Sequence, residues 1–77
     1  MKYIVATYLD SVNLNRDRCG NIRLALDWIE ASRAAHPLAC HSIYRAQDSH
    51  LIAQWELGRL TVNRASGEDK RLIEATR

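Results

Sequence analysis

The sequence predicts a single α+β domain over residues 1–77, with one main helix packed on an antiparallel sheet in the order β-α-β-β(-β) and a possible short C-terminal helix. Three observations lead to this prediction. The chain opens with a strand-like run at 2–9, changes to a helical period at 22–35, and then alternates again on both sides of 47–49. A chain of this length buries only about 60 to 65% of its unfolded surface, which suits one helix on one sheet.

The opening run KYIVATYL at 2–9 is rich in β-branched and aromatic residues, which favour strands. Alternation gives two faces: Tyr3, Val5, Thr7 and Leu9 on one, and Ile4, Ala6 and Tyr8 on the other. Both faces are apolar, so we expect this strand in the interior of the sheet. Residues 10–20 combine Asp, Asn and Arg with a glycine, and we expect a loop there.

The helix at 22–35 is the most regular element of the sequence. Asn21 is a favourable N-cap, and the apolar residues then recur with a period of 3.6. Pro37 disfavours helical geometry at His36, so the helix should end at about Ala35. Its apolar stripe contains Ile22, Ala25, Leu26 and Ile29, widened by Leu24 and Trp28.

The stretch LIAQWELGRL at 51–60 allows two interpretations. As a helix ending at Gly58, it would belong to a small helical protein of the kind that docks in a DNA groove. As a strand, it alternates and turns back at Gly58-Arg59, which gives a meander behind one helix. The helix would be only about two turns long and would place Gln54 and Glu56 near its apolar edge. We therefore favour the strand.

The remaining elements are shorter. Residues 39–46 alternate loosely and predict a strand, and 47–49 have turn chemistry. A short strand is expected at 60–63. The pattern at 66–69 resembles a capping box, and a terminal helical turn or two is expected at 70–75.

Composition and charge narrow the function classes. The chain is 47% apolar and 26% charged, which is typical of a globular protein. The apolar runs are shorter than the roughly 18 residues of a membrane span, and Asp10 interrupts any secretory leader. We expect a cytoplasmic protein, with Cys19 and Cys40 as free thiols in a reducing cytosol and a disulfide as the alternative. The net charge of +2 is only mildly basic.

Residues with catalytic or metal-binding side chains do not form a standard motif. A zinc site could be drawn from Cys40, its neighbours His36 and His41, and Cys19 or His50, but the spacing matches no zinc knuckle. A Cys-His nucleophile would lack an orienting third group and an oxyanion hole. Glycine-rich phosphate loops are also missing. We therefore expect no enzymatic activity, no cofactor and no metal.

Arginines are the more informative residues. They occur in the predicted loop, at the helix end, in the second predicted strand and after the predicted turn, as Arg16, Arg18, Arg33, Arg45 and Arg59. Such side chains can gather at one end of a small α/β layer and bind phosphates as bidentate forks. The alternative is that Arg23 and Arg33 pair with acids on the helix and the others maintain solubility. The exposed aromatic motif of ribonucleoprotein sheets is not present.

One helix covers only one face of a sheet, so the other face must meet solvent or a partner. Tyr3 or Tyr8, Tyr44, and Ile52 or Trp55 should be divided between the two faces. An aromatic ring near an arginine is a composition that recurs in interface hot spots. The alternative is that all the rings lie in the core.

Four stretches resemble the small phage-encoded anti-CRISPR proteins that inhibit type I CRISPR surveillance complexes, in particular the type I-F inhibitor with one helix on an antiparallel sheet. The first two are Lys-Tyr-Ile at 2–4 and the acid-and-arginine loop with glycine at 16–20. The third is the helix end Ile-Glu-Ala-Ser-Arg at 29–33, where the family has Ile-Ala-Ser-Lys. The fourth is Ile-Ala-Gln-Trp-Glu-Leu-Gly-Arg at 52–59, similar to the family's Leu-Ala-Tyr-Lys-Glu-Asp-Gly-Lys.

The resemblance implies a monomeric, non-enzymatic inhibitor that acts in the host bacterial cytosol. It would bind the backbone subunits that carry the guide RNA and block hybridisation of the target DNA sterically. Tyr3 and Arg33 occupy the positions of the family's first-strand tyrosine and of its basic residue at the helix end. Arg59 occupies the position of the family's lysine in the hairpin. Arg18 and Arg45 complete the predicted partner-binding surface. Non-specific binding of double-stranded DNA is a further implication.

The sequence departs from the family pattern in a longer segment at 34–39 and in an extension from Arg64. These departures leave the CRISPR subtype open. Two other hypotheses remain: a small stand-alone nucleic-acid-binding or regulatory module that uses the same arginines, and an accessory phage protein unconnected with nucleic acid.

Overall fold

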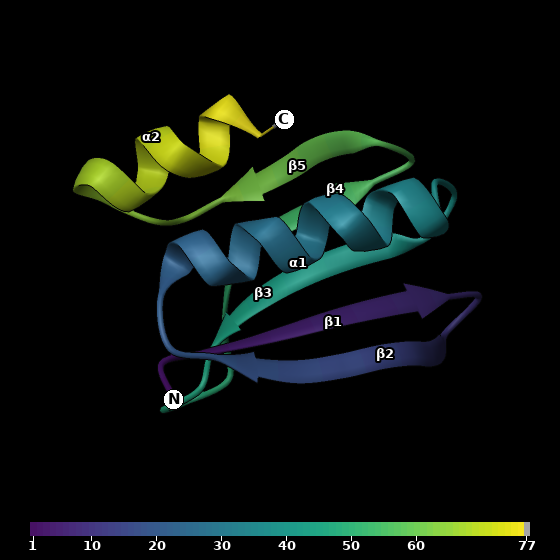
Figure 1. Ribbon diagram of the computed structural model, residues 1–77, viewed down its shortest axis with the longest axis horizontal. Helices are drawn as coiled ribbons and strands as arrows, with labels where there is room; N and C mark the ends of the chain where they lie inside the picture. Colours follow the sequence, from purple (N-terminus) through teal and green to yellow (C-terminus); the bar gives the residue numbers. More distant parts are fainter. Residues whose placement is uncertain (77) are drawn as a thin grey trace.

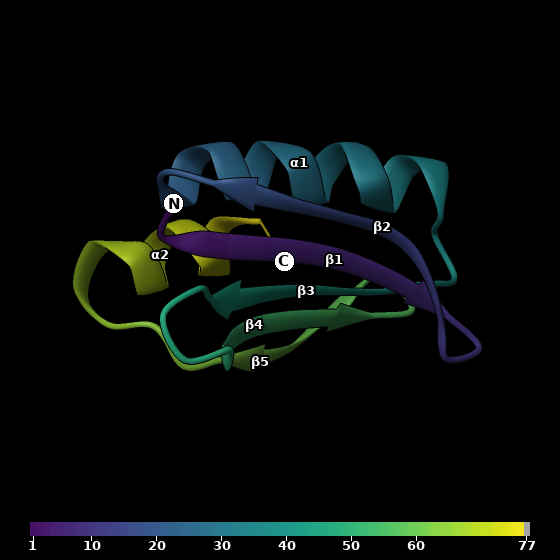
Figure 2. The ribbon, with the colours of Figure 1, turned by 90° about the horizontal axis from the view of Figure 1, so that it is seen from below.

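The computed structural model describes residues 1–76 as a five-stranded antiparallel sheet with two helices, which confirms the predicted α+β class (Figure 1). The sheet order is β2-β1-β3-β4-β5, and α1 lies across one face of it (Figure 2). No helix among the described residues is long and apolar enough to cross a membrane. The elements are β1 (Tyr3–Leu9), β2 (Val12–Cys19), α1 (Ile22–Ala35), β3 (Cys40–Arg45), β4 (His50–Glu56), β5 (Arg59–Asn63) and α2 (Gly67–Ala75).

The predicted loop at 10–20 is wrong, because most of it forms the edge strand β2. Leu9 pairs with Val12, so Asp10 and Ser11 form the turn, with φ of 51° and 67°. Positive φ at both turn residues is what a type I′ hairpin requires. Seven of the eight residues of β2 are exposed, with only Cys19 buried. The strand is therefore held by its backbone pairing with β1, and no apolar alternation marks it in the sequence.

The helix α1 begins and ends where the sequence predicts. The side chain of Asn21 accepts a hydrogen bond from the backbone N–H of Leu24 at 3.0 Å. The predicted apolar stripe is buried against the sheet, whereas Leu24 is 54% exposed. Arg23 contacts Glu68 of α2 at 3.4 Å, so the structure shows its ion pair between helices and not the expected one within α1.

The ambiguous stretch at 51–60 adopts the strand interpretation. Trp55 on β4 is fully buried and belongs to the core formed with α1. The turn is Leu57-Gly58, one residue earlier than predicted, because Arg59 already pairs with Glu56 in β5. Both turn residues have positive φ, 51° at Leu57 and 76° at Gly58. The core contains Val5, Ile22, Ala25, Leu26, Ile29, Ile43, Ile52, Ala53, Trp55 and Ile73, with Cys19 at its edge.

The helix α2 is longer than the predicted 70–75. It starts at Gly67, and the side chain of Ser66 makes no capping hydrogen bond, so the predicted capping box is wrong. The carboxylate of Asp69 instead accepts a hydrogen bond from the Tyr3 hydroxyl at 3.0 Å. Ile73 is fully buried, so α2 completes the core at the β5 edge of the sheet (Figure 1).

A buried polar chain links α1 to the sheet. The Ser32 hydroxyl lies 2.6 Å from the Thr7 hydroxyl, which lies 3.0 Å from Nδ1 of His41. Nε2 of His41 lies 3.0 Å from the carbonyl oxygen of His36. His41 is only 1% exposed. Because His41 is buried on the helix side of β3, both of its ring nitrogens need hydrogen-bond partners, and Thr7 and His36 provide them.

Candidate functional site on the uncovered sheet face

Among the residues that the structure describes, no helix covers the face of the sheet opposite α1 (Figure 2). Strand alternation assigns its side chains, because neighbours in each strand point to opposite faces. Val5 and Ile43 belong to the core beneath α1. The uncovered face therefore carries Ile4, Ala6 and Tyr8 on β1, Cys40, Ser42 and Tyr44 on β3, and Gln54 on β4.

In the middle of this face, small residues lie beneath larger ones. Ala6 and Ser42 pair with each other and have no exposed surface, although no helix lies over them. The larger side chains around them must therefore screen them from solvent. Tyr8, Tyr44 and Gln54 are each half-buried, and together with Ser42 they line one hollow.

Gln54 is held in place within this hollow. Its Nε2 donates to Sγ of Cys40 at 3.1 Å and lies 3.5 Å from Oγ of Ser42. The far end of the hollow is lined by Asp10 and Glu56, together with the exposed leucines Leu9, Leu38 and Leu57.

Arginines on the edge strand β2 border the uncovered face. Arg16 pairs with Ala6 and Arg18 pairs with Ile4, so both belong to the same face, and both are exposed. Arg18 also lines a second hollow at the end of the sheet where β1 begins, together with Lys2, Tyr3 and Arg45. We call Lys2, Arg18 and Arg45 the basic end. Lys2 precedes β1, Arg18 belongs to β2, and Arg45 is the last residue of β3.

The charge of Arg45 is partly satisfied within the protein. Its Nε and Nη2 donate to the two carboxylate oxygens of Asp48 at 3.0 and 2.7 Å. These hydrogen bonds, together with one from the His50 N–H, lower the pKa of Asp48 to about 2, and they raise the pKa of Arg45. Any anion that binds Arg45 must therefore compete with Asp48 or share the guanidinium with it.

The five predicted partner-binding residues do not form one surface. Tyr3, Arg18 and Arg45 lie together at the basic end. Arg33 and Arg59 lie at the opposite end, where α1 finishes and β4 turns into β5 (Figure 1). The cause is topological, because β1 starts at the end where β3 finishes, whereas the β4–β5 turn is at the other end.

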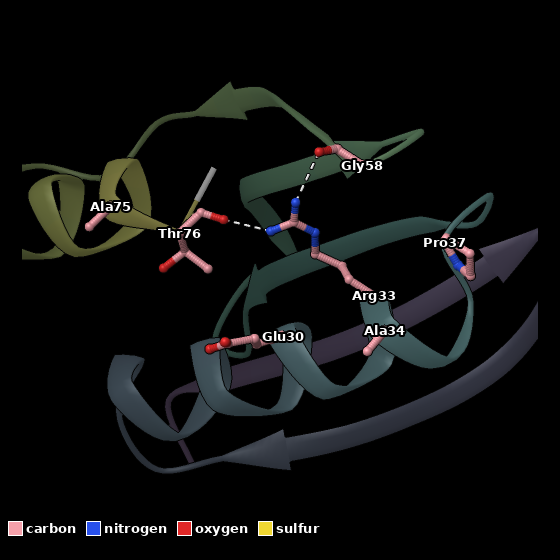
Figure 3. Close-up of a pocket in the computed structure, with 7 residues that line it drawn as sticks. All are labelled: Glu30, Arg33, Ala34, Pro37, Gly58, Ala75 and Thr76. Carbon is pink, nitrogen blue, oxygen red and sulfur yellow. Dashed lines mark hydrogen bonds between the residues drawn. The ribbon is translucent and has the colours of Figure 1, made fainter.

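Arg33 is engaged inside the protein (Figure 3). Its Nη1 donates to the carbonyl oxygen of Thr76, and its Nη2 donates to that of Gly58 at 2.9 Å. Its guanidinium carbon also lies 6.0 Å from the ring centre of Trp55. Arg33 therefore ties α1 to the end of α2 and to the β4–β5 turn.

Tyr3 is likewise half-buried, and its hydroxyl donates to Asp69. Burial is the main cause that raises the pKa of this hydroxyl, and the contact with Asp69 raises it further. Two of the residues transferred from the family resemblance, Tyr3 and Arg33, thus contact α2 or the residue that follows it. Arg59 is exposed at the start of β5.

Lys2 and Gln54 were not predicted as site residues, and the sequence did not show on which face of the sheet Tyr8 lies. The alternation in β1 groups Tyr8 with Ala6 and Ile4, but it does not tell which of the two faces α1 covers. Within residues 1–76, His, Cys, Asp and Glu side chains form no group of three that could hold a metal ion.

No protein-family model matches the chain, and no curated protein or solved structure is significantly similar to it.

Proposed function

We propose that this protein is a non-enzymatic nucleic-acid-binding module that holds phosphates at its basic end. The observation that supports this function best is that Lys2, Arg18 and Arg45 converge on one hollow beside a sheet face with two half-buried tyrosines. Arginine forks and a lysine ammonium are common phosphate-binding groups. The site offers no nucleophile with a base beside it, and this favours binding over catalysis.

The small net charge of +2 is compatible with this proposal, because the charges are unevenly distributed. Acids and bases nearly cancel over the whole chain, whereas the hollow of the basic end is lined by three cations, of which Arg45 is bound by Asp48. Three phosphates neutralised there on a single strand give a slope of about −2 in a plot of log affinity against log salt. We therefore expect weak to moderate binding that weakens as the salt concentration rises.

The test is fluorescence anisotropy with a labelled oligonucleotide of about 12 nucleotides at a series of salt concentrations. Arg18→Glu should lower the affinity and make the salt slope shallower by about 0.7, the contribution of one phosphate contact. Arg71→Glu on α2 is the matched control, because it changes the net charge equally and Arg71 is exposed and does not line the hollow of the basic end. Equal losses in the two variants would show a non-local charge effect and would remove the basic end as the site.

A second candidate is the anti-CRISPR function implied by the family resemblance, and one observation favours a protein partner. Three exposed leucines, Leu9, Leu38 and Leu57, gather at the end of the molecule opposite the basic end. Apolar side chains grouped on a surface commonly mark protein contacts. A protein with a basic end and an apolar end is suited to a nucleoprotein target in the bacterial cytosol, such as a type I surveillance complex.

This candidate predicts co-purification of the tagged protein with a reconstituted type I surveillance complex and loss of target-DNA binding in a mobility shift. Arg59→Glu is the informative variant because Arg59 is exposed, whereas changes at Tyr3 or Arg33 also remove internal hydrogen bonds. Arg71→Glu again serves as the control. Failure to associate with complexes of several subtypes would exclude this candidate without affecting the nucleic-acid proposal.

A further inference from the structure

We infer that the hollow on the uncovered face is a base-binding groove, which makes the preferred ligand a single-stranded nucleic acid. This inference rests on the proposed function and adds to it the part of the ligand that is recognised. Phosphates at the basic end would account only for affinity, whereas a groove that contacts bases distinguishes single strands from duplexes.

The side chains of the uncovered face form rows across the sheet. One row runs Arg18, Ile4, Tyr44, and the next runs Arg16, Ala6, Ser42, Gln54. In both rows the arginine is on the edge strand β2 and the uncharged groups lie inward. A single strand that follows β2 can place its phosphates on the arginines and its bases over β1 and β3.

The walls of the groove carry two aromatic rings. Tyr8 and Tyr44 are half-buried, so each ring keeps one part open to the groove. They pair with Cys40 and Ile4 respectively, which separates them by four residues, or ~13 Å, along the strands. Between them lie Ala6 and Ser42, which the larger side chains screen from solvent, so a base in the groove would contact the tyrosine rings and Gln54 and not the sheet beneath them. Aromatic rings spaced along a sheet are the usual stacking platform for unpaired bases.

The polar groups that line the groove suit the edges of bases. Nε2 of Gln54 is bonded to Cys40, which directs the amide so that its oxygen is left to accept from the amino group of a base. Asp10 and Glu56 line the far end, where their charges repel phosphates but accept from amino groups. No cation lines this hollow among the described residues. Its chemistry therefore fits bases and not the backbone.

The experiment compares three labelled ligands with the wild-type protein: a single strand of about 12 nucleotides, the same strand with abasic sites, and the corresponding duplex. We expect the single strand to bind at least fivefold more tightly than the abasic strand, about the lower limit for one stacked base. The duplex should also bind more weakly, because its bases are already stacked. This comparison needs no variant, so it does not depend on how a substitution affects folding.

Variants then locate the contact. Tyr8→Ala should lower the affinity for the single strand at least about fivefold and leave the salt slope unchanged, because it removes a ring and no charge. Tyr8→Phe should retain the affinity, because the stacking ring remains. Leu24→Ala on the exposed side of α1 is the control for loss of an apolar side chain outside the groove.

The outcomes separate the two proposals. Equal affinity for the normal and abasic strands, with a salt slope still present, would overturn the base-binding groove and leave phosphate binding intact. An unchanged affinity of Tyr8→Ala would also overturn it. Absence of binding to all three ligands at low salt would overturn the proposed function itself.

Discussion

At the scale of single residues, His41 shows how burial determines protonation. A carbonyl oxygen can only accept, so Nε2 of His41 carries the proton that it donates to His36, and Nδ1 accepts from the Thr7 hydroxyl. The Ser32 hydroxyl then donates to Thr7. Burial lowers the pKa of His41, and the hydrogen bond to His36 opposes this shift, while the nearby charges of Arg33 and His36 add to it.

This lowered pKa predicts a loss of stability in acid. Because the pKa is lower in the folded protein than the ordinary value of 6.5, the unfolded chain takes up the proton first. The contribution of His41 is therefore complete above pH 6.5 and decreases as the pH falls towards the folded pKa. Urea unfolding at several pH values should show the free energy of unfolding falling in this range. His50→Gln, at an exposed position, is the control and should keep this pH dependence. If the pH dependence disappeared in His50→Gln, it would come from His50 and not from His41.

Leu57 is a second residue whose local state costs stability. It has a φ of 51°, a conformation unfavourable for leucine, and its side chain is 69% exposed. Asn-Gly is the preferred pair for a turn with positive φ at both positions. Leu57→Asn should therefore raise the free energy of unfolding by about 0.5 to 1 kcal/mol, measured by urea unfolding. If Leu57→Asn were less stable than the wild type, the leucine side chain would make stabilising contacts despite its large exposed fraction.

At the scale of elements, α2 is joined to the rest of the protein by side chains that the sequence suggested for a partner. Arg33 bonds to Thr76 just after α2, and Tyr3 bonds to Asp69 within it. Ile73 adds a fully buried apolar side chain. These contacts fasten the helix at points spread over its length, in addition to the exposed pair of Arg23 with Glu68.

Arg33→Ala tests this fastening. The substitution removes two hydrogen bonds from a charged donor and the contact with Trp55, so we expect a loss of about 2 kcal/mol in the free energy of unfolding. The control is Arg23→Ala, because the pair of Arg23 with Glu68 is exposed on both sides and should contribute at most a few tenths of a kcal/mol. Thermal or urea unfolding measures both. Equal losses in the two variants would mean that Arg33 is no more important than an ordinary surface arginine.

At the scale of the whole molecule, the distribution of charge matters more than its sum. The basic end and the apolar end lie at opposite ends of a molecule about 31 Å long, with the groove of the uncovered face between them. The ion pair of Arg45 with Asp48 reduces the positive charge available at the basic end. Asp48 therefore acts as a competitor for any phosphate that approaches Arg45.

Removing this competitor should tighten binding. Asp48→Asn keeps an acceptor for the His50 N–H and frees the guanidinium of Arg45. We expect the affinity for an oligonucleotide to rise on the order of fivefold, equivalent to about 1 kcal/mol, in anisotropy titrations at low salt. Asp27→Asn on the exposed side of α1 changes the net charge equally and serves as the control. An equal gain in both variants would indicate a general charge effect.

The sequence by itself determined the α+β class, the start and end of α1, the interior position of β1 and the strand interpretation of 51–60. These features follow from local periodicity, capping and the length of apolar runs, which are properties of neighbouring residues. It could not reveal β2, because a polar edge strand is stabilised by backbone pairing with β1 and leaves no apolar pattern.

Only the tertiary structure decided which residues share a site. The five predicted residues lie at two opposite ends of the molecule, and Arg33 and Tyr3 form hydrogen bonds with α2 or the residue after it. Gln54 and Tyr8 lie on the uncovered face. The physical reason is that strand register and the choice of the face covered by α1 depend on contacts between residues far apart in the chain. Side chains of identical chemistry therefore acquire different surroundings from the topology: Arg18 is exposed on the edge strand, whereas Arg33 is bonded to other parts of the protein.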